Sequence, residues 1–216
     1  MSHVTLVRHG QANSAARTEG DYDRLSDLGH QQAAWLGEHF RDAGETFARA
    51  YCGTLRRHAE TAAAMGAEDL VIDPRLNELE YFTLSQLLEQ QQGVAIPRDR
   101  EGFLRHMPRV FSEWQAGRID NAPESFEAFE TRTREAIEEI SAGEGRALVV
   151  TSGGLIGMAI RIVMGLDVTA MSHLCLAIEN SSVHRLHPMP TGLALVQFNA
   201  LPHLEHPHRQ HARSHL

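Results

Sequence analysis

The sequence has very little cysteine, and the two residues it has are widely separated. Cys52 and Cys175 are the only cysteines among 216 residues. Neither their number nor their spacing fits a disulfide framework or a cysteine-based metal site. The sequence therefore predicts a protein whose thiols stay reduced, as in the cytoplasm.

An excess of positive charge is also missing. The formal net charge is −8 at pH 7, which argues against broad electrostatic binding to nucleic acid or to an anionic membrane surface. Residues 1–3 lead straight into the first predicted strand, without the basic and apolar regions of a signal peptide. The apolar stretch 147–166 is interrupted by a glycine pair and an arginine. It fits a buried strand followed by a helix better than a membrane span.

Short apolar runs alternate with stretches of helical periodicity, which is typical of an α/β fold. The chain is 42% hydrophobic, enough for one substantial core. We predict helices over residues 26–40, with Ser26 as N-cap, and over residues 55–66 and 153–165. The predicted strands are residues 3–7, 47–51, 70–72, 146–151, 182–187 and 193–198.

Residues 81–142 interrupt this alternation. Apolar and aromatic side chains recur there at helical spacing, and no strand signal lies between them. We predict a helical insertion that covers one end of the sheet, closes over the ligand pocket and sets its specificity. Its aromatic residues are interpreted as packing residues rather than as a cofactor site.

The last segment, residues 201–216, is rich in histidine. A metal site is conceivable there, but two prolines and the scarcity of apolar residues favour a frayed surface tail. Residues 1–200 are then predicted to form a single domain, with 81–142 inserted in it. The histidines of the tail are His203, His206, His208, His211 and His215.

Arg8-His9-Gly10 directly follows the apolar run of residues 4–7. A strand that ends there brings an imidazole and a guanidinium to its carboxyl end, where open α/β sheets bind ligands. Gly10 lets the backbone turn and approach a ligand closely. The alternative interpretation is a loop that happens to hold two basic residues, and the tripeptide alone does not decide between them.

Further segments follow in a recognisable order. They are Leu55-Arg56-Arg57-His58-Ala59-Glu60-Thr61, Leu76-Asn77-Glu78, Thr151-Ser152-Gly153-Gly154 and Asn180-Ser181-Ser182-Val183. Together with the N-terminal tripeptide, they resemble the histidine phosphatase superfamily, also called the phosphoglycerate mutase-like group, over most of the chain. The resemblance implies a three-layer αβα sandwich with a mostly parallel central sheet and a helical cap.

The resemblance also implies roles for individual residues. His9 is the expected nucleophile, which takes the phosphoryl group as a phosphohistidine that water later hydrolyses. Arg8 and Arg57 are expected to bind the phosphoryl oxygens, and the Leu-x-Arg spacing of the family selects Arg57 rather than Arg56. Glu78 is expected to protonate the leaving oxygen and then to activate water.

The phosphate site implied by the resemblance also includes Gly10, Ser152 and Gly153, and the helix that starts at the glycine pair offers backbone N–H groups to an anion. Ser152 departs from the family, which usually has Ser-His-Gly-Gly at this strand end with the histidine donating to the phosphoryl oxygens. If that donor is missing, Ser152→His should raise turnover. His58, His184 and His187 could take over the role, but surface or structural roles are favoured for each.

The leading hypothesis is a cytoplasmic phosphatase-like hydrolase of a small phosphomonoester that needs no metal and no cofactor. The alternative is a non-catalytic pseudophosphatase that binds a phosphorylated ligand, which the serine at position 152 favours. A phosphoglycerate mutase is less favoured because the first loop lacks the longer pattern of the glycolytic mutases. No nucleic acid or membrane partner is expected. The oligomeric state stays open, with a homodimer among the options.

Overall fold

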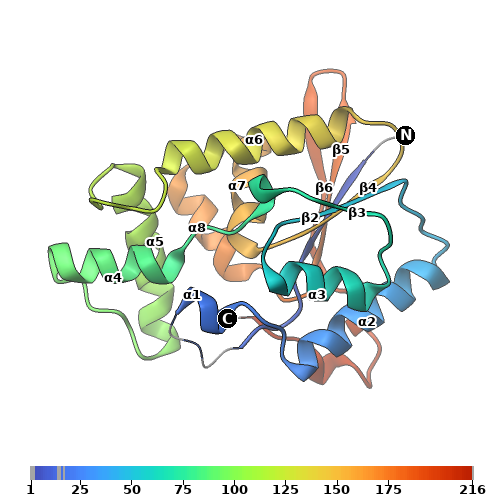
Figure 1. The fold of residues 1–216 in the computed structure, drawn as a ribbon, viewed down its shortest axis with the longest axis horizontal. Helices are drawn as coiled ribbons and strands as arrows, with labels where there is room; N and C mark the ends of the chain where they lie inside the picture. Colours follow the sequence, from blue (N-terminus) through green and yellow to red (C-terminus); the bar gives the residue numbers. More distant parts are fainter. Residues whose placement is uncertain (1–2, 14–15, 17, 216) are drawn as a thin grey trace.

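A six-stranded mixed sheet forms the centre of the molecule (Figure 1). The computed structural model describes residues 3–13, 16 and 18–215. Residues 1–2 and 216, which the predicted domain and tail include, lie outside the described residues. The strands are β1 (Val4–Arg8), β2 (Arg49–Cys52), β3 (Leu70–Ile72), β4 (Ala147–Thr151), β5 (Val183–Met189) and β6 (Gly192–Ala200).

The order of the strands is β3-β2-β4-β1-β5-β6. The first four are mutually parallel, whereas β5 runs antiparallel to β1, and β6 antiparallel to β5. The expectation of a mostly parallel α/β sheet is therefore confirmed. Each predicted strand forms, with ends that differ from the prediction by about two residues or fewer.

The two faces of the sheet carry separate apolar clusters. On one face Val7 packs with α2 (Asp27–Asp42) and α3 (Arg56–Met65). On the other face Val4 and Leu6 pack in the cluster that contains α7 (Gly153–Met164). Successive side chains of a strand point to opposite faces, so an entirely buried β1 needs helices on both sides, and the result is a three-layer αβα sandwich.

The predicted helix ends are also seen. The Ser26 hydroxyl accepts a hydrogen bond from the Gly29 N–H at 3.1 Å and caps α2. Helices α3 and α7 end at Gly66 and Gly165, which have φ values of 77° and 66°. Glycine takes this left-handed conformation without the strain that a side chain would add.

Residues 81–142 form helices only. These are α4 (Tyr81–Gln92), α5 (Arg100–Gln115) and α6 (Phe126–Ala142). Helices α4 and α5 lie beyond one end of the sheet, where α5 packs against α8 (Val168–Ala177), while α6 runs alongside α7 (Figure 1). Trp114 lies with its ring centroid 5.1 Å from Phe126 and 5.6 Å from Phe129, so these aromatics are packing residues.

The prediction of a frayed C-terminal tail was wrong. The tail contains the 3-10 turns Pro202–Leu204 and Gln210–Ala212. Leu204 and Ala212 are fully buried and pack with Trp35 of α2, and the Gln32 amide donates to the Ala212 carbonyl at 2.6 Å. The tail has few apolar residues, so it shows no apolar pattern that predicts packing. The few that it has contact one face of α2.

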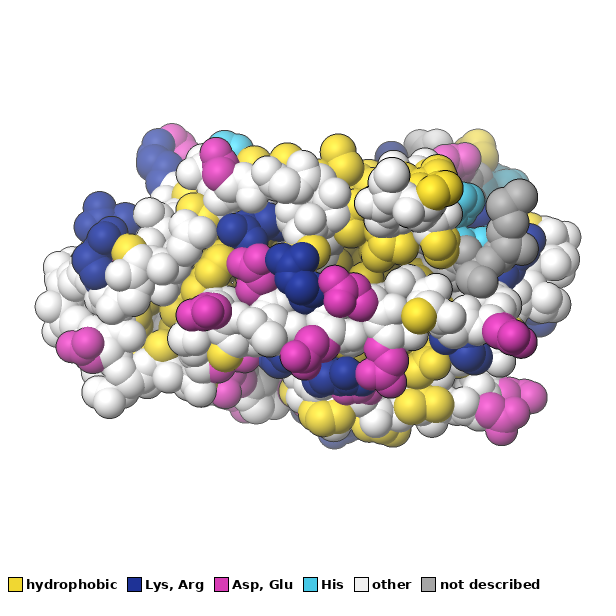
Figure 2. Space-filling view, turned by 90° about the horizontal axis from the view of Figure 1, so that it is seen from above, with side chains coloured by type: hydrophobic (Ala, Val, Ile, Leu, Met, Phe, Trp, Pro, Cys, Tyr) yellow, Lys and Arg dark blue, Asp and Glu magenta, His cyan; other side chains and the backbone are white. Residues whose placement is uncertain are grey.

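The face that carries α6 mixes both signs of charge, as Figure 2 shows. Glu130 pairs with Arg134 at 2.8 Å, and Glu139 pairs with Arg75 at 2.8 Å. Within residues 3–13, 16 and 18–215, no helix combines the length and apolarity needed to cross a membrane. In the same part of the chain, no group of three or more His, Cys, Asp or Glu residues is arranged to hold a metal ion.

Candidate active site

The carboxyl ends of β1, β2 and β4 lie at one edge of the sheet, and a cavity of about 680 Å³ lies there. Arg8 and His9 enter it from the end of β1, and Arg57 from the first turn of α3. Glu78, from the loop before α4, and Gly153, at the start of α7, complete this part of the wall. The fold thus brings to one cavity five residues that the sequence spreads over 146 positions (8 to 153).

His9 is held in one tautomer. Its backbone N–H donates to the Thr151 carbonyl at 2.8 Å, and its Nδ1 lies 2.7 Å from the Gly10 carbonyl oxygen. Because a carbonyl oxygen only accepts, Nδ1 carries the proton and Nε2 keeps its lone pair. Burial, then the charges of Arg57 and Arg8, hold the pKa of His9 well below its ordinary value. The ring is therefore neutral at neutral pH and has a free nitrogen.

The two site arginines have donors left over. Arg57 is buried, and its Nη1 lies 3.0 Å from Asp23 Oδ1, while Arg8 donates through Nη1 to the Ile178 carbonyl at 2.5 Å. The Nε atoms of both are buried, and the described residues offer them no acceptor. Arg56 instead leaves two thirds of its side chain exposed, 67%. The site thus holds guanidinium N–H groups without an acceptor, which suit an anion.

Glu78 is fixed by backbone donors. Its Oε2 accepts from the Gly154 N–H at 2.8 Å, at the N-terminus of α7, and its Oε1 accepts from the Leu79 N–H at 3.0 Å. The preceding loop is held by Arg132 of α6, which donates to the Asn77 carbonyl at 2.7 Å. The carboxylate is therefore oriented within the cavity wall before any ligand binds.

The three remaining predicted site residues differ in position. Gly153 lines the cavity, whereas Gly10 and Ser152 do not. The Gly10 N–H donates to Thr61 Oγ1 at 3.1 Å, and a Cβ on Gly10 would lie 2.3 Å from the Gly29 carbonyl oxygen. Residue 10 must therefore be glycine because its backbone lies close to α2, not because it lies close to a ligand.

The sequence reasoning missed Glu19. This residue starts α1 (Glu19–Tyr22), lines the cavity and accepts a hydrogen bond from the Phe82 N–H at 2.8 Å. Burial raises the pKa of its carboxyl to about 7, against the opposing effects of that hydrogen bond and of Arg57. A polar helix of four residues has no periodic signal that could have indicated it.

Of the three histidines considered as substitutes, one lies at the site. His58 is fully buried on α3, and its Nε2 lies 2.7 Å from Ser152 Oγ. His184 is buried within the sheet, where its Nδ1 accepts from the Asn199 N–H at 3.2 Å, in a structural role as predicted. His187 stacks on His3 at the opposite end of β1, with ring centroids 4.9 Å apart.

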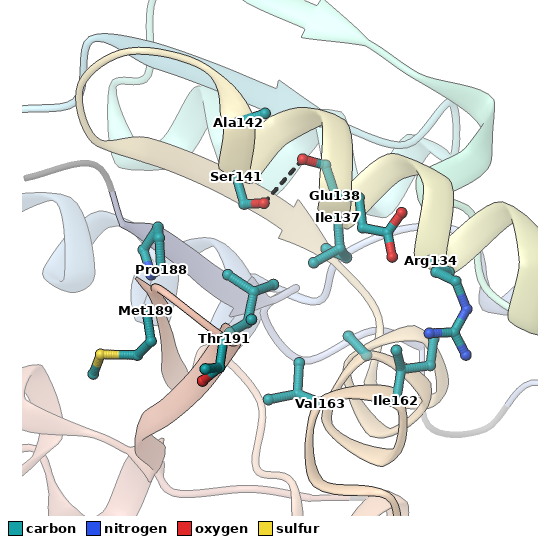
Figure 3. A pocket seen from close by; sticks show the side chains of 13 residues that line it. Arg134, Ile137, Glu138, Ser141, Ala142, Ile162, Val163, Pro188, Met189 and Thr191 are labelled. Atoms are coloured by element: carbon teal, nitrogen blue, oxygen red, sulfur yellow. Dashed lines mark hydrogen bonds between the residues drawn. The ribbon is translucent and has the colours of Figure 1, made fainter.

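A second cavity, of about 500 Å³, lies between α6, α7 and the β5–β6 turn (Figure 3). Because β5 runs antiparallel to β1, this turn is at the edge where the parallel strands begin, opposite the first cavity. Its wall includes Arg134, Glu138 and Ser141, whose hydroxyl donates to the Glu138 carbonyl at 2.9 Å, but no histidine. The cavity that His9 lines is therefore the candidate active site.

The fold and the site define an α/β sandwich with a histidine and two buried arginines around one cavity. The sequence model of the histidine phosphatase superfamily (branch 1) matches residues 4–201. The chain belongs to this superfamily. The C-terminal tail lies almost wholly outside the match.

Relatives of the chain have both mutase and phosphatase names. It is 33% identical over 192 residues to "Probable phosphoglycerate mutase GpmB" of Erwinia tasmaniensis, covering 86% of this chain and 85% of the relative. A phosphoserine phosphatase mutant of Entamoeba histolytica, solved with phosphoserine, superposes with a TM-score of 0.70, at 17% identity, covering 94% and 100%. A phosphoglycerate mutase of Bacillus anthracis superposes with a TM-score of 0.68, at 22% identity, covering 94% of each chain.

Proposed function

We propose that this protein hydrolyses a small phosphomonoester by way of a phosphohistidine at His9. The observation that carries the proposal is the neutral His9 ring, whose Nδ1–H donates to the Gly10 carbonyl and whose Nε2 lone pair is available. Arg8 and Arg57, with unpaired Nε donors, supply the charge that a phosphate dianion needs. Phosphoryl transfer depends mainly on such positioning and charge stabilisation.

The first step transfers the phosphoryl group to the enzyme. The His9 Nε2 lone pair forms the bond to phosphorus while the bond to the ester oxygen breaks, and protonated Glu78 gives its proton to that leaving oxygen. The Gly10 carbonyl accepts from Nδ1–H and stabilises the positive charge that develops on the ring. In the second step the Glu78 carboxylate takes a proton from water, the water oxygen bonds to phosphorus, and the P–N bond breaks.

The outer part of the cavity favours an apolar organic group on the substrate. Helices α4 and α5 and the segment between them supply most of this wall. Its apolar residues include Phe82, Ile96, Phe103, Met107 and Phe111. We therefore expect aryl phosphates to be better substrates than phosphates of small polyols, because only the former bury apolar area against this wall.

The decisive experiment is steady-state hydrolysis of p-nitrophenyl phosphate across about pH 5 to 8 with EDTA present. Wild type is compared with His9→Ala and with His173→Ala, which changes an exposed histidine on α8. We expect turnover in wild type and in the His173 variant, and none in the His9 variant. Acid-labile, alkali-stable phosphate on wild type after a rapid quench identifies phosphohistidine. Retained turnover in the His9 variant overturns the mechanism.

Three other outcomes are informative. Tight binding of phosphate or vanadate without turnover of any of a broad set of phosphomonoesters would select the non-catalytic pseudophosphatase instead. A third possibility is that the protein interconverts the two phosphoglycerates and that a doubly phosphorylated primer stimulates it. This result would indicate mutase activity, as in the names of several relatives. Activity that EDTA abolishes would contradict the metal-independent route.

A further inference from the structure

The cavity has a second group of charged side chains that the mechanism above does not use. Arg98, Asp99 and Arg100 line it where the chain enters α5, and His215 of the C-terminal tail lines it as well. The three cap residues are exposed to solvent, and His215 is partly buried. We refer to these four residues as the mouth of the cavity.

The two mouth arginines have no carboxylate partner. Among the ion pairs of residues 3–13, 16 and 18–215, none includes Arg98 or Arg100. Arg105, further along α5, instead pairs with Glu101 at 2.9 Å. Because a guanidinium carries several N–H donors and fits a carboxylate with two parallel hydrogen bonds, the mouth is suited to an anionic group of a ligand.

Asp99 leaves a positive charge at the mouth. Its Oδ1 accepts a hydrogen bond from the Gly102 N–H at 2.8 Å and caps α5. Two guanidinium groups and one carboxylate, apart from His215, together carry one positive charge. A ligand group with a single negative charge balances it, whereas a phosphate dianion exceeds it. The charge at the mouth therefore favours a carboxylate.

The tail holds one of these arginines in place. His215 Nε2 contacts Nη2 of Arg100, and because a guanidinium only donates, the imidazole nitrogen is the acceptor. The preceding residue is fixed, since Ser214 Oγ lies 2.9 Å from Gln32 Nε2 and the Ser214 carbonyl accepts from the Asn180 N–H at 2.8 Å. One arm of the Arg100 guanidinium is thus held by the tail, and its other N–H groups remain for a ligand.

The mouth adjoins the apolar part of the cavity. Phe103 lines the cavity three residues after Arg100 on α5, and residues at this spacing lie on the same face of a helix. A ligand that packs its organic group against Phe103 therefore has Arg100 beside it. Such a ligand extends from the buried Arg8 and Arg57 to the mouth.

We propose that the substrate carries a carboxylate on its organic group, that Arg98 and Arg100 bind this carboxylate, and that His215 positions Arg100. The proposal rests on the proposed function for the phosphate end of the substrate and names the chemistry of its other end. His215 lies beyond residues 4–201, which the family model matches. This part of the wall is therefore supplied by the tail that docks on α2.

The test compares three phenyl phosphates that differ only in the para substituent. One carries a carboxymethyl group, one the neutral carbamoylmethyl group of the same shape, and one the cationic aminomethyl group. A methylene separates each substituent from the ring, so the intrinsic reactivities are similar. Wild type should have a kcat/KM for the acid about five- to tenfold above that for the amide, as expected for exposed paired charges, and the lowest for the amine. Equal values for the acid and the amide would overturn the proposal.

Variants separate direct contact from a general effect of charge. Arg98→Gln combined with Arg100→Gln should remove the preference for the acid and leave the kcat/KM for the amide near that of wild type. Arg105→Gln is the matched control, because it removes a charge from α5 at a side chain that is 74% exposed and does not line the cavity. It should keep the preference. An equal loss of preference in Arg100→Gln and Arg105→Gln would contradict direct contact.

The role of His215 is tested by separating KM from kcat. His215→Ala should raise the KM for the acid about twofold, as expected for one exposed interaction, with kcat and the KM for the amide unchanged. His215→Gln keeps an acceptor for Arg100 and should restore the KM of wild type. Equal changes for the acid and the amide, or no rescue by glutamine, would contradict the positioning role.

Binding measurements distinguish failure of this proposal from failure of the proposed function. In the two benzylphosphonates with para carboxymethyl and carbamoylmethyl groups, a methylene replaces the ester oxygen, so they bind without being hydrolysed. If wild type turns over none of the esters but binds the acid phosphonate more tightly by calorimetry, the hydrolase proposal fails and the carboxylate site stands. Turnover of the esters with equal dissociation constants for both phosphonates has the opposite meaning. Neither turnover nor binding would overturn both.

Discussion

Under the proposed function, the ionisation of single residues decides when the cavity can accept a phosphate dianion. His9 is neutral because burial and two arginines lower its pKa, and Glu19 keeps its proton up to about pH 7 because burial raises its pKa. Below that pH Glu19 adds no negative charge to the cavity, which four arginines line. Above it, the Glu19 carboxylate opposes the substrate.

We predict that Glu19→Gln changes the alkaline side of the pH profile. The kcat/KM of wild type should fall above about pH 7 as Glu19 ionises and repels the substrate. The glutamine keeps an acceptor for the Phe82 N–H but carries no charge, so its kcat/KM should stay level over the same range. Steady-state rates of both proteins at constant ionic strength measure this, and parallel profiles would contradict it.

The same substitution should alter the pH dependence of stability. The pKa of Glu19 is about 7 in the folded protein and 4.5 as its ordinary value. The folded protein thus binds this proton more tightly than the unfolded chain, and stability falls as pH rises between these values. Glu19→Gln removes that loss. The Tm difference between variant and wild type should shift in favour of the variant from about pH 5 to about pH 8.

The structure reverses the sequence-based expectation for Ser152→His. Ser152 is fully buried with His58 Nε2 at 2.7 Å, so a second imidazole overpacks the site, at a cost of about 1–3 kcal/mol. We predict that Ser152→His alone lowers both kcat and Tm. Combined with His58→Ala, which vacates the space, it should give a higher kcat than His58→Ala alone. A higher kcat for Ser152→His alone than for wild type would contradict this.

At the level of helices and strands, periodicity located most of the fold. Strands β1 and β4 are continuous apolar runs because they are buried on both faces. Ser26 and Gly165 marked helix ends because capping is a local property of the backbone. Helix α1, and Glu19 with it, was not predicted because a helix of four residues is too short to show a periodic pattern.

The cap helices permit a test of substrate recognition by a single element. Phe103 of α5 lines the cavity, with its ring centroid 5.3 Å from that of Tyr81. We predict that Phe103→Ala raises the KM for p-nitrophenyl phosphate about fivefold, roughly 1 kcal/mol of lost apolar contact, with kcat unchanged. The inhibition constant of inorganic phosphate should not change, because phosphate does not reach α5.

Leu104→Ala is the matched control for this experiment. Leu104 follows Phe103 on α5, is 41% exposed and does not line the cavity. Its KM should equal that of wild type. An equal rise in KM for both variants would indicate a general loosening of the cap rather than a contact with the substrate.

Across the whole molecule, the contacts between distant segments were the part that the sequence could not predict. The motifs placed Arg8, His9, Arg57 and Glu78 at one edge because strand ends meet there in a parallel sheet. No such rule relates His58 to Ser152, because that contact depends on the packing of α3 against β4. The docking of the tail on α2 likewise depends on a few apolar side chains matching one helix face.

The tail also connects the far end of the chain to the active site. The Asn180 N–H donates to the Ser214 carbonyl at 2.8 Å, and Asn180 lines the cavity. Its side-chain amide lies 3.5 Å from the His9 carbonyl oxygen. The tail thus supports the segment that closes the site behind His9, and its docking contributes to both stability and site geometry.

We therefore predict that Leu204→Ala is strongly destabilising although it lies in a histidine-rich tail. Leu204 is fully buried against Trp35, so its truncation should cost about 2–5 kcal/mol, a fall in Tm of roughly 4–20 °C. His208→Ala, an exposed change in the same tail, should leave Tm within about 1 °C of wild type because surface substitutions cost little. Differential scanning calorimetry of the three proteins measures the difference. Equal Tm values for all three would mean that the tail is not docked in solution.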